Sequence, residues 1–375
     1  MQKMSKEKKI LVVFGTRPEA IKMCPLIIEL KKNKSVKCVV CLTGQHKELL
    51  NQVMNVFDME ADYNLNIMQE CQTITDITIK ILAGLDVVLR DENPDLVLVH
   101  GDTTTSFSAA LAAFYKKIPV GHVEAGLRTG NMYSPYPEEM NRNLTSKIAT
   151  YHFAPTNNNA DNLQKEGIET GIYVTGNTVI DAFKYTVADN YRFEEPKLRK
   201  INFQKNKIIL LTVHRRENLG NCLENIFEAI KRIVCDNRDC MVIYPMHPNP
   251  VIRKLAEECL KNNDQIQMCE PLNVLDMHNL LKRCYCVMTD SGGLQEEAPA
   301  FGKPVLVMRK ETERPEAVLA GTVKLVGTEQ EEIVAEANKI IRSKEAYNLM
   351  ANAVSPYGDG NASRRIVDAI LADLD

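Results

Sequence analysis

The sequence has no tryptophan, no clear excess of either charge and no long apolar run. Its 46 Lys and Arg residues nearly balance 49 Asp and Glu residues, which gives a formal net charge of -3. This balance argues against the strong basic field typical of nucleic-acid binding. The apolar stretch at residues 10–14 is too short for a signal-peptide core or a membrane span. We therefore expect a cytoplasmic protein with neither nucleic acid nor membrane as a partner.

Disulfides and metal sites are not indicated either, although the chain has 11 cysteines. The number is odd, and a chain without a leader is expected in a reducing compartment. Two close pairs, Cys38 with Cys41 and Cys284 with Cys286, lack a second Cys or His pair at zinc-finger spacing. We expect buried free thiols and no metal site.

The 375 residues suffice for two domains, each with its own core. Short runs rich in Val, Ile and Leu recur, and helical patterns follow them. Because these runs are continuously apolar, they predict strands buried on both faces of a parallel sheet. The expected fold is α/β, with two Rossmann-like doubly wound domains. The predicted strands cover residues 10–15, 36–43, 95–102, 119–126, 151–156 and 173–176, then 207–214, 241–247, 266–270, 285–290, 304–308 and 322–327.

Changes of composition set the expected domain boundaries. A polar, charged segment with Pro196 separates the two series of strands and predicts a linker. We expect an N-terminal domain over residues 1–190, the linker over 191–206 and a C-terminal domain over 207–355. Residues 356–375 break the pattern and end in a helix, which can pack back on the N-terminal domain.

Ligands of open parallel sheets bind beyond the carboxyl ends of the strands, so polar residues there mark candidate sites. After the first strand, Gly15 permits a tight turn before a helix start, and Arg17 and Lys22 add positive charge. Together they favour a phosphate. The alternative is an exposed arginine in an ordinary loop. Neither a GxGxxG fingerprint nor a Walker motif is present.

Two carboxylates, Asp102 and Glu124, follow neighbouring predicted strands, an arrangement suited to acid/base chemistry. Asp102 could instead cap the next helix. Glu138 and Glu139 open a further predicted helix, where they can complement its dipole. Glu138 and Arg142 also have the i,i+4 spacing of an ordinary surface ion pair. Pattern alone leaves these alternatives open.

In the second domain, residues 214–216 read His-Arg-Arg directly after a predicted strand. A lone histidine such as His214 is more often structural, but two flanking arginines suggest an anion site. His247 ends the next strand with a weaker signal. Arg314 belongs to a cationic segment, residues 309–316, at the same sheet edge.

The strongest local signal is a predicted strand followed by Ser291, Gly292 and Gly293 and then by a helix start. Bare backbone N–H groups and the helix dipole can approach a diphosphate there, and Glu297 can accept hydrogen bonds from ribose hydroxyls. The alternative is a plain turn with a helix cap. Both domains thus carry strand-end groups that predict an interdomain cleft for a nucleotide-sugar.

Six motifs together resemble one family: VFGTRPEAIKM (13–23), HGDTTT (100–105), GHVEAGLRT (121–129), VHRREN (213–218), DSGGLQEEA (290–298) and TERPE (312–316). In this order, over essentially the whole chain, they resemble the bacterial non-hydrolysing UDP-N-acetylglucosamine (UDP-GlcNAc) 2-epimerases. The resemblance implies a GT-B-like fold, a homodimer and no redox cofactor or metal.

The activity that this resemblance implies is interconversion of UDP-GlcNAc and UDP-N-acetylmannosamine (UDP-ManNAc) for surface polysaccharides. UDP leaves by anti elimination to a 2-acetamidoglucal, and re-addition follows protonation of C2 from the other face. Asp102, Glu124 and Glu138 are then the acid/base carboxylates, and His214 lies near the diphosphate and sugar. The implied UDP-sugar-binding residues are Arg17, Lys22, Arg142, Ser291, Gly292, Gly293, Glu297 and Arg314.

The chain departs from the family pattern at several positions. Tyr136 stands where the family often has Trp, and Met277 where a Phe commonly contacts the uracil. Some relatives bind a second UDP-GlcNAc as an activator, but here Cys71 replaces an Arg and Glu48 stands where a Gln can occur. Activation by substrate is therefore left open. Candidate residues of such an allosteric site are Gln45, His46, Gln72 and His247.

Three alternative functions fit parts of the pattern. A hydrolysing relative would release free ManNAc and UDP. A GT-B glycosyltransferase would also bind a UDP-sugar but would need an acceptor. A non-catalytic UDP-sugar sensor would leave the three carboxylates unexplained.

Overall fold

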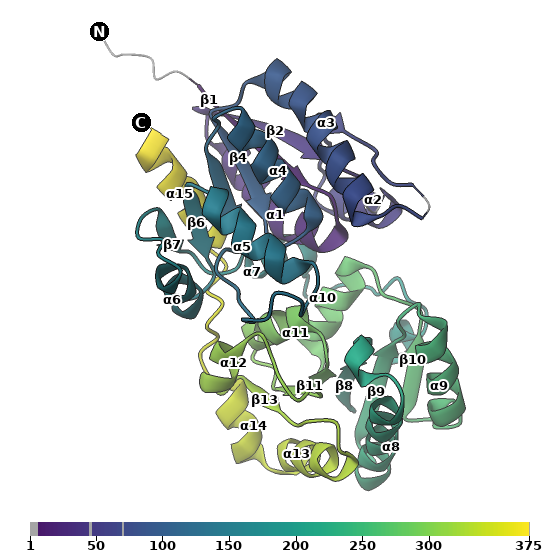
Figure 1. The fold of residues 1–375 in the computed structure, drawn as a ribbon. Helices are drawn as coiled ribbons and strands as arrows, with labels where there is room; N and C mark the ends of the chain where they lie inside the picture. The colour runs from purple at the N-terminus through teal and green to yellow at the C-terminus, as the bar shows by residue number, and fades with distance from the viewer. Residues whose placement is uncertain (1–6, 45–46, 70, 375) are drawn as a thin grey trace. The chain divides into compact units, whose positions relative to one another are not determined.

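The computed structural model describes residues 7–44, 47–69 and 71–374, and the chain divides into two compact units (Figure 1). The first unit runs to Tyr185 and includes the C-terminal residues from Tyr357 onward. The second comprises Thr186–Pro356. Residues 191–206, predicted as a linker, lie in the second unit. Among the described residues, no helix is both long and apolar enough to cross a bilayer.

A seven-stranded parallel sheet forms the centre of the first unit, in the order β3-β2-β1-β4-β5-β6-β7. Its inner strands are mainly apolar because helices cover both faces, as the sequence predicts. The pattern missed only the two-residue edge strand β3. The strands are β1 (Lys8–Phe14), β2 (Val36–Leu42), β3 (Tyr63–Asn64), β4 (Leu96–His100), β5 (Val120–Val123), β6 (Tyr151–Ala154) and β7 (Ile172–Val174).

The helices of the first unit begin at side-chain caps in several places. Thr16 and Glu19 form a capping box at α1, and Thr73 and Asp76 form another at α3. The helices are α1 (Arg17–Lys32), α2 (Lys47–Val56), α3 (Ile74–Glu92), α4 (Thr104–Tyr115), α5 (Glu138–Ile148), α6 (Asn157–Lys165), α7 (Thr178–Thr186) and α15 (Ala362–Leu374).

The C-terminal helix α15 packs beside α1, with the other elements of the first unit (Figure 1). Its N-terminus is capped by the buried Asp181 carboxylate, which accepts from the backbone N–H groups of Ala362 at 3.1 Å and Ser363 at 2.9 Å. Contacts between residues that are 181 and 182 positions apart in the sequence thus complete this unit.

The second unit has a six-stranded parallel sheet in the order β10-β9-β8-β11-β12-β13. Its strands are β8 (Lys207–Thr212), β9 (Cys240–Pro245), β10 (Ile266–Cys269), β11 (Cys286–Thr289), β12 (Val305–Val307) and β13 (Val323–Leu325). Around it lie α8 (Asn221–Asp236), α9 (Pro250–Leu260), α10 (Val274–Arg283), α11 (Gly292–Glu297), α12 (Pro315–Leu319), α13 (Gln330–Arg342) and α14 (Lys344–Ala351), with 3-10 turns η1 (Leu198–Lys200), η2 (Arg216–Asn218) and η3 (Ala298–Phe301).

Residues 191–206 are tied to this unit by the buried carboxylate of Asp276 on α10. It accepts hydrogen bonds from the backbone N–H groups of Glu194 at 2.9 Å and Glu195 at 2.8 Å, and from the Tyr191 hydroxyl at 2.8 Å. A polar composition here reflects hydrogen-bonded packing on α10.

Candidate functional site

Polar loops gather where the strand order of each sheet reverses. In the first sheet this point lies between β1 and β4, and in the second between β8 and β11. Ligands of doubly wound sheets bind beyond the carboxyl ends of the strands at such points. The loops after these four strands are therefore the candidate site of each unit.

The buried Glu19 carboxylate holds the first of these loops together. It accepts hydrogen bonds from the backbone of Gly15 at 2.9 Å and Thr16 at 2.8 Å, and from the Thr103 hydroxyl at 2.7 Å. Gly15 leaves room for this arrangement, because an added Cβ would lie 2.0 Å from Thr43 Oγ1. The sequence interpretation missed Glu19, although Thr followed three residues later by Glu is a capping-box signature.

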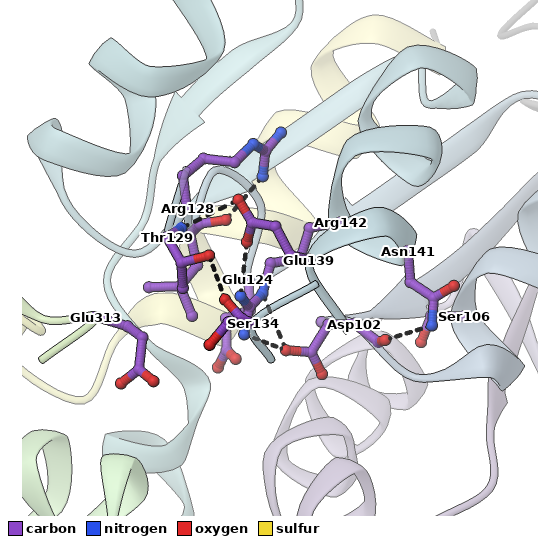
Figure 2. Close-up of polar contacts among 12 residues, drawn as sticks. Asp102, Ser106, Glu124, Arg128, Thr129, Ser134, Glu139, Asn141, Arg142 and Glu313 are labelled. Atoms are coloured by element: carbon purple, nitrogen blue, oxygen red, sulfur yellow. Dashed lines mark hydrogen bonds and ion pairs between the residues drawn. The ribbon is translucent and has the colours of Figure 1, made fainter. Parts of the chain in front are cut away.

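Asp102 follows β4 and pairs with Arg142 of α5. Arg142 Nε and Nη2 donate to Asp102 Oδ2 at 3.0 and 2.6 Å, and Asn141 Nδ2 donates to the Asp102 carbonyl at 2.9 Å (Figure 2). The alternative of a helix cap is wrong, because Thr103 caps α4 with its own side chain. The Asp102 side chain is 26% exposed, so its carboxylate remains accessible.

Arg142 lies between two carboxylates, since its Nη1 also donates to Glu139 Oε2 at 2.9 Å (Figure 2). Glu139 is buried, and its Oε1 accepts from the backbone N–H groups of Thr129 at 3.0 Å and Gly130 at 3.1 Å. Glu139 therefore supports the loop that follows β5. It orients Arg142 toward Asp102 at the same time.

Glu124 directly follows β5 with a backbone φ of 62°, in the left-handed region that residues with side chains rarely adopt. Its Oε2 forms an ion pair with Lys22 of α1, accepts from Asn177 Nδ2 at 3.0 Å and lies 3.5 Å from His100 Nε2. Burial alone would raise the pKa of the Glu124 carboxyl, but Lys22 and His100 hold it well below its usual range. Glu124 is thus an ionised carboxylate in a strained, fixed position.

Glu138, the third predicted carboxylate, begins α5 and is partly buried. Within the described part of the chain, no donor lies within hydrogen-bond distance of its carboxylate. The surface ion pair considered for Glu138 and Arg142 is not formed, because Arg142 contacts Asp102 and Glu139. Arg17 begins α1 and is also partly buried.

In the second unit, buried Asp290 at the end of β11 organises the loop after β8. It accepts from the backbone N–H groups of His214 at 2.9 Å and Arg215 at 2.8 Å, and from Asn218 Nδ2 at 3.0 Å. His214 Nδ1 lies 3.3 Å from Asp290, and its ring stacks on His247 with centroids 5.4 Å apart. Burial lowers the pKa of His214, although Asp290 opposes the shift. His214 is therefore an oriented, mainly neutral imidazole at neutral pH.

The Arg314 guanidinium lies against the start of α11. A Cβ on Gly292 would come within 2.4 Å of Arg314 Nη1, so the close approach needs glycine. Arg314 Nε donates to the buried Glu296 at 2.6 Å, and Ser291 begins the helix without a side-chain cap. A fixed guanidinium beside the first backbone N–H groups of a helix suits a diphosphate.

Glu297 lies at the end of α11 with a partly exposed carboxylate. Its Oε2 lies 3.6 Å from His278 Nε2, and His278 Nδ1 forms a hydrogen bond with the Thr186 hydroxyl at 2.8 Å. Met277 neighbours His278 on α10 and is partly buried. The Glu297 carboxylate is therefore near a fixed, buried imidazole.

Of the residues considered for a second UDP-GlcNAc, Gln45 and His46 lie outside the described residues. Gln72 in the first unit accepts from the Gln69 backbone at 3.3 Å, and His247 in the second is exposed beside His214. All eleven cysteines are free thiols. No group of three His, Cys, Asp or Glu side chains suited to a metal occurs in the described ranges.

The two parallel-sheet units define the class of protein. A kitacinnamycin glycosyltransferase, 10% identical, matches the structure with a TM-score of 0.68 over 99% of this chain and 100% of that chain. The chain therefore has the GT-B type of fold, and the predicted α/β fold class is confirmed.

The sequence profile of the UDP-N-acetylglucosamine 2-epimerase family matches residues 28–371, and the chain belongs to this family. The Bacillus subtilis UDP-N-acetylglucosamine 2-epimerase is 53% identical over 98% of this chain and 96% of its own. The Neisseria meningitidis UDP-GlcNAc 2-epimerase, in a crystal structure bound to UDP-GlcNAc, is 47% identical with a TM-score of 0.88. That match covers 97% of this chain and 100% of the other. The predicted family is confirmed.

Proposed function

We propose that this chain interconverts UDP-GlcNAc and UDP-ManNAc by inverting the sugar at C2, without a redox cofactor or metal. Family membership supports the activity, and the Neisseria meningitidis relative bound to UDP-GlcNAc supports the substrate. The observation in this chain that carries the proposal is the pair of carboxylates at neighbouring strand ends, Asp102 on Arg142 and Glu124 on Lys22.

The proposed chemistry is an anti elimination followed by re-addition. A carboxylate takes the C2 proton while the C2–H electrons form the C1=C2 bond and UDP leaves with the electrons of the C1–O bond. UDP then returns to C1 after C2 accepts a proton on its other face, so atoms and charges balance. Because the C2 proton is weakly acidic, the step needs a fixed base and cations that stabilise the departing phosphate. We assign the proton transfers to Asp102, Glu124 and Glu138.

The second unit is proposed to hold the UDP. The start of α11 at Ser291, Gly292 and Gly293 would receive the diphosphate, with Arg314 supplying positive charge. Glu297 has a partly exposed carboxylate suited to ribose hydroxyls, and His214 is a neutral, oriented donor for the phosphate or sugar. Arg17, Lys22 and Arg142 add cationic groups from the first unit.

Hydrolysis is the alternative outcome on the same scaffold. Incubation with UDP-GlcNAc should give a stable mixture of UDP-GlcNAc and UDP-ManNAc, measured by ¹H and ³¹P NMR. Accumulation of free ManNAc with UDP in its place would show a hydrolase. Turnover only with an added sugar acceptor would show a glycosyltransferase.

We also propose a homodimer that acts in the cytoplasm. Exposed apolar side chains occur on the neighbouring helices α3 and α4, where Ile79 is 59%, Phe114 59% and Tyr115 67% exposed. Solvent-facing aromatic groups of this kind mark protein interfaces. A reducing compartment fits the free thiols.

The dimer proposal predicts that Phe114→Glu with Tyr115→Glu converts the protein to a monomer in light scattering coupled to gel filtration. A charge at each position costs little in a monomer but opposes burial in an interface. Lys324→Glu on β13, which changes the charge in the other unit, is the control. An unchanged dimer in the double variant, or a wild-type monomer, contradicts the proposal.

A further inference from the structure

The side chain of Asn177, between β7 and α7, is fixed at both ends of its amide. Its Nδ2 donates to Glu124 Oε2 at 3.0 Å, and its Oδ1 accepts from the Val179 backbone N–H at 3.1 Å. The residue is only 2% exposed. The bond from Val179 identifies which end of the amide carries oxygen, so the NH₂ group necessarily faces Glu124.

The backbone of Asn177 is held by the crossover, defined here as residues 357–361, which leads into α15. Asn177 N–H donates to the Tyr357 carbonyl at 2.8 Å. Gly176 and Gly358 pack backbone to backbone, because a Cβ on Gly358 would lie 3.1 Å from Gly176 Cα. The end of the chain therefore fixes the position from which Asn177 reaches Glu124.

Titratable groups face Glu124 from two other elements, Lys22 on α1 and His100 on β4. Both contact Oε2, the oxygen that also accepts from Asn177. Oε1 lies toward Gly101, 3.7 Å from where a Cβ on that glycine would stand. One carboxylate oxygen is thus immobilised by three neighbours, and the other remains for proton transfer.

We propose that Asn177 is a positioning residue that locks Glu124 Oε2 so that Oε1 exchanges the proton with C2 of the sugar. This role rests on the proposed epimerase function. A neutral amide donor is suited to it, because it orients the carboxylate and stabilises the anion without adding a charge to the Lys22–Glu124 pair.

The test compares Asn177→Ala and Asn177→Asp with the wild-type chain. Loss of a hydrogen bond to a charged group predicts a fall in kcat of about 10- to 100-fold for Asn177→Ala, with KM changed much less. The acid limb of the kcat–pH profile should move to higher pH, because the anion loses a donor. Asn177→Asp keeps the side-chain shape and the hydrogen bond from Val179. Its carboxylate beside Glu124 should move the acid limb further to higher pH, because a second negative charge disfavours the Glu124 anion.

Asp181→Asn is the matched control, because it weakens the capping of α15 without touching Glu124. It should lower the melting temperature and leave the acid limb in place. Wild-type kcat and pH profile in both Asn177 variants would overturn the proposal, as would the same limb shift in Asp181→Asn. A wild-type chain that does not epimerise would instead remove the proposed function, and this role with it.

Discussion

At the scale of single residues, the candidate carboxylates have different surroundings. Glu124 is partly buried against Lys22 and held in a left-handed backbone conformation, whereas Asp102 is 26% exposed and paired with Arg142. Glu138 begins a helix and keeps its carboxylate free of described donors. Different surroundings give carboxyl groups different proton affinities, as acid/base chemistry on two faces of one carbon requires.

These surroundings predict that Asp102→Asn or Glu124→Gln lowers C2 proton exchange at least 100-fold, because each removes a base while keeping the side-chain shape. UDP binding, measured by calorimetry, should persist. Glu166→Gln is a matched control, since Glu166 is 27% exposed and pairs with Arg128 as Asp102 pairs with Arg142. Exchange near the wild-type rate in either variant would remove that carboxylate from the mechanism.

Sequence patterns could identify many residues of the candidate site but not their contacts. Asp102, Glu124 and His214 follow buried strands, which is a local signal. The pairing of Lys22 with Glu124 depends on how α1 lies relative to the loop after β5, and no sequence spacing predicts it. Asn177 carried no signal, because its position is set by Tyr357, far along the chain.

At the scale of elements, the strands were predictable because both faces of each sheet are covered and their residues are continuously apolar. The two-residue strand β3 is too short for such a signal. Residues 191–206 are polar, and their composition predicts a linker. The backbone N–H groups of Glu194 and Glu195 nevertheless donate to the Asp276 carboxylate and fix this segment to α10. A polar composition indicates that a segment can be exposed to solvent, whereas these hydrogen bonds depend on where α10 lies in the folded chain.

The neighbouring strands β5 and β6 carry the buried histidines His122 and His152 in register. Burial lowers the pKa of His122 to about 3, despite a 2.7 Å hydrogen bond with the Gly101 carbonyl, and that of His152 to about 4. Both are neutral in the folded chain at neutral pH. As the pH falls, the unfolded chain binds protons at these two histidines below the ordinary pKa of about 6.5, whereas the folded chain binds them only at lower pH.

These shifts predict that the two histidines contribute fully to the free energy of unfolding above about pH 6.5. This contribution is lost as the pH falls toward their pKa values in the folded chain. Each histidine contributes a slope of about 1.4 kcal/mol per pH unit in that window. Urea unfolding should give a smaller free energy of unfolding at pH 5.5 than at pH 7.5. The difference between the two pH values should be smaller in His122→Gln, which retains an amide donor. Equal stability of the wild-type chain at both pH values would contradict the prediction.

At the scale of the whole molecule, the C-terminal residues return to the first unit and complete the support of Glu124 through Asn177. The sequence showed only that the strand pattern breaks at residue 356. The family, by contrast, could be predicted from six motifs that span nearly the whole chain, and the comparisons confirm it. The order of the motifs indicates family membership. The contacts that make the site rigid can be seen only in the folded chain.

Inversion at C2 requires the loss and return of the C2 proton. Incubation with UDP-GlcNAc in D₂O, without added NAD or metal, followed by NMR and mass spectrometry of the intact UDP-sugars, measures this exchange. We predict deuterium at C2 in both UDP-GlcNAc and UDP-ManNAc as the epimers approach equilibrium. Intact UDP-sugar without deuterium at every enzyme concentration would contradict the account.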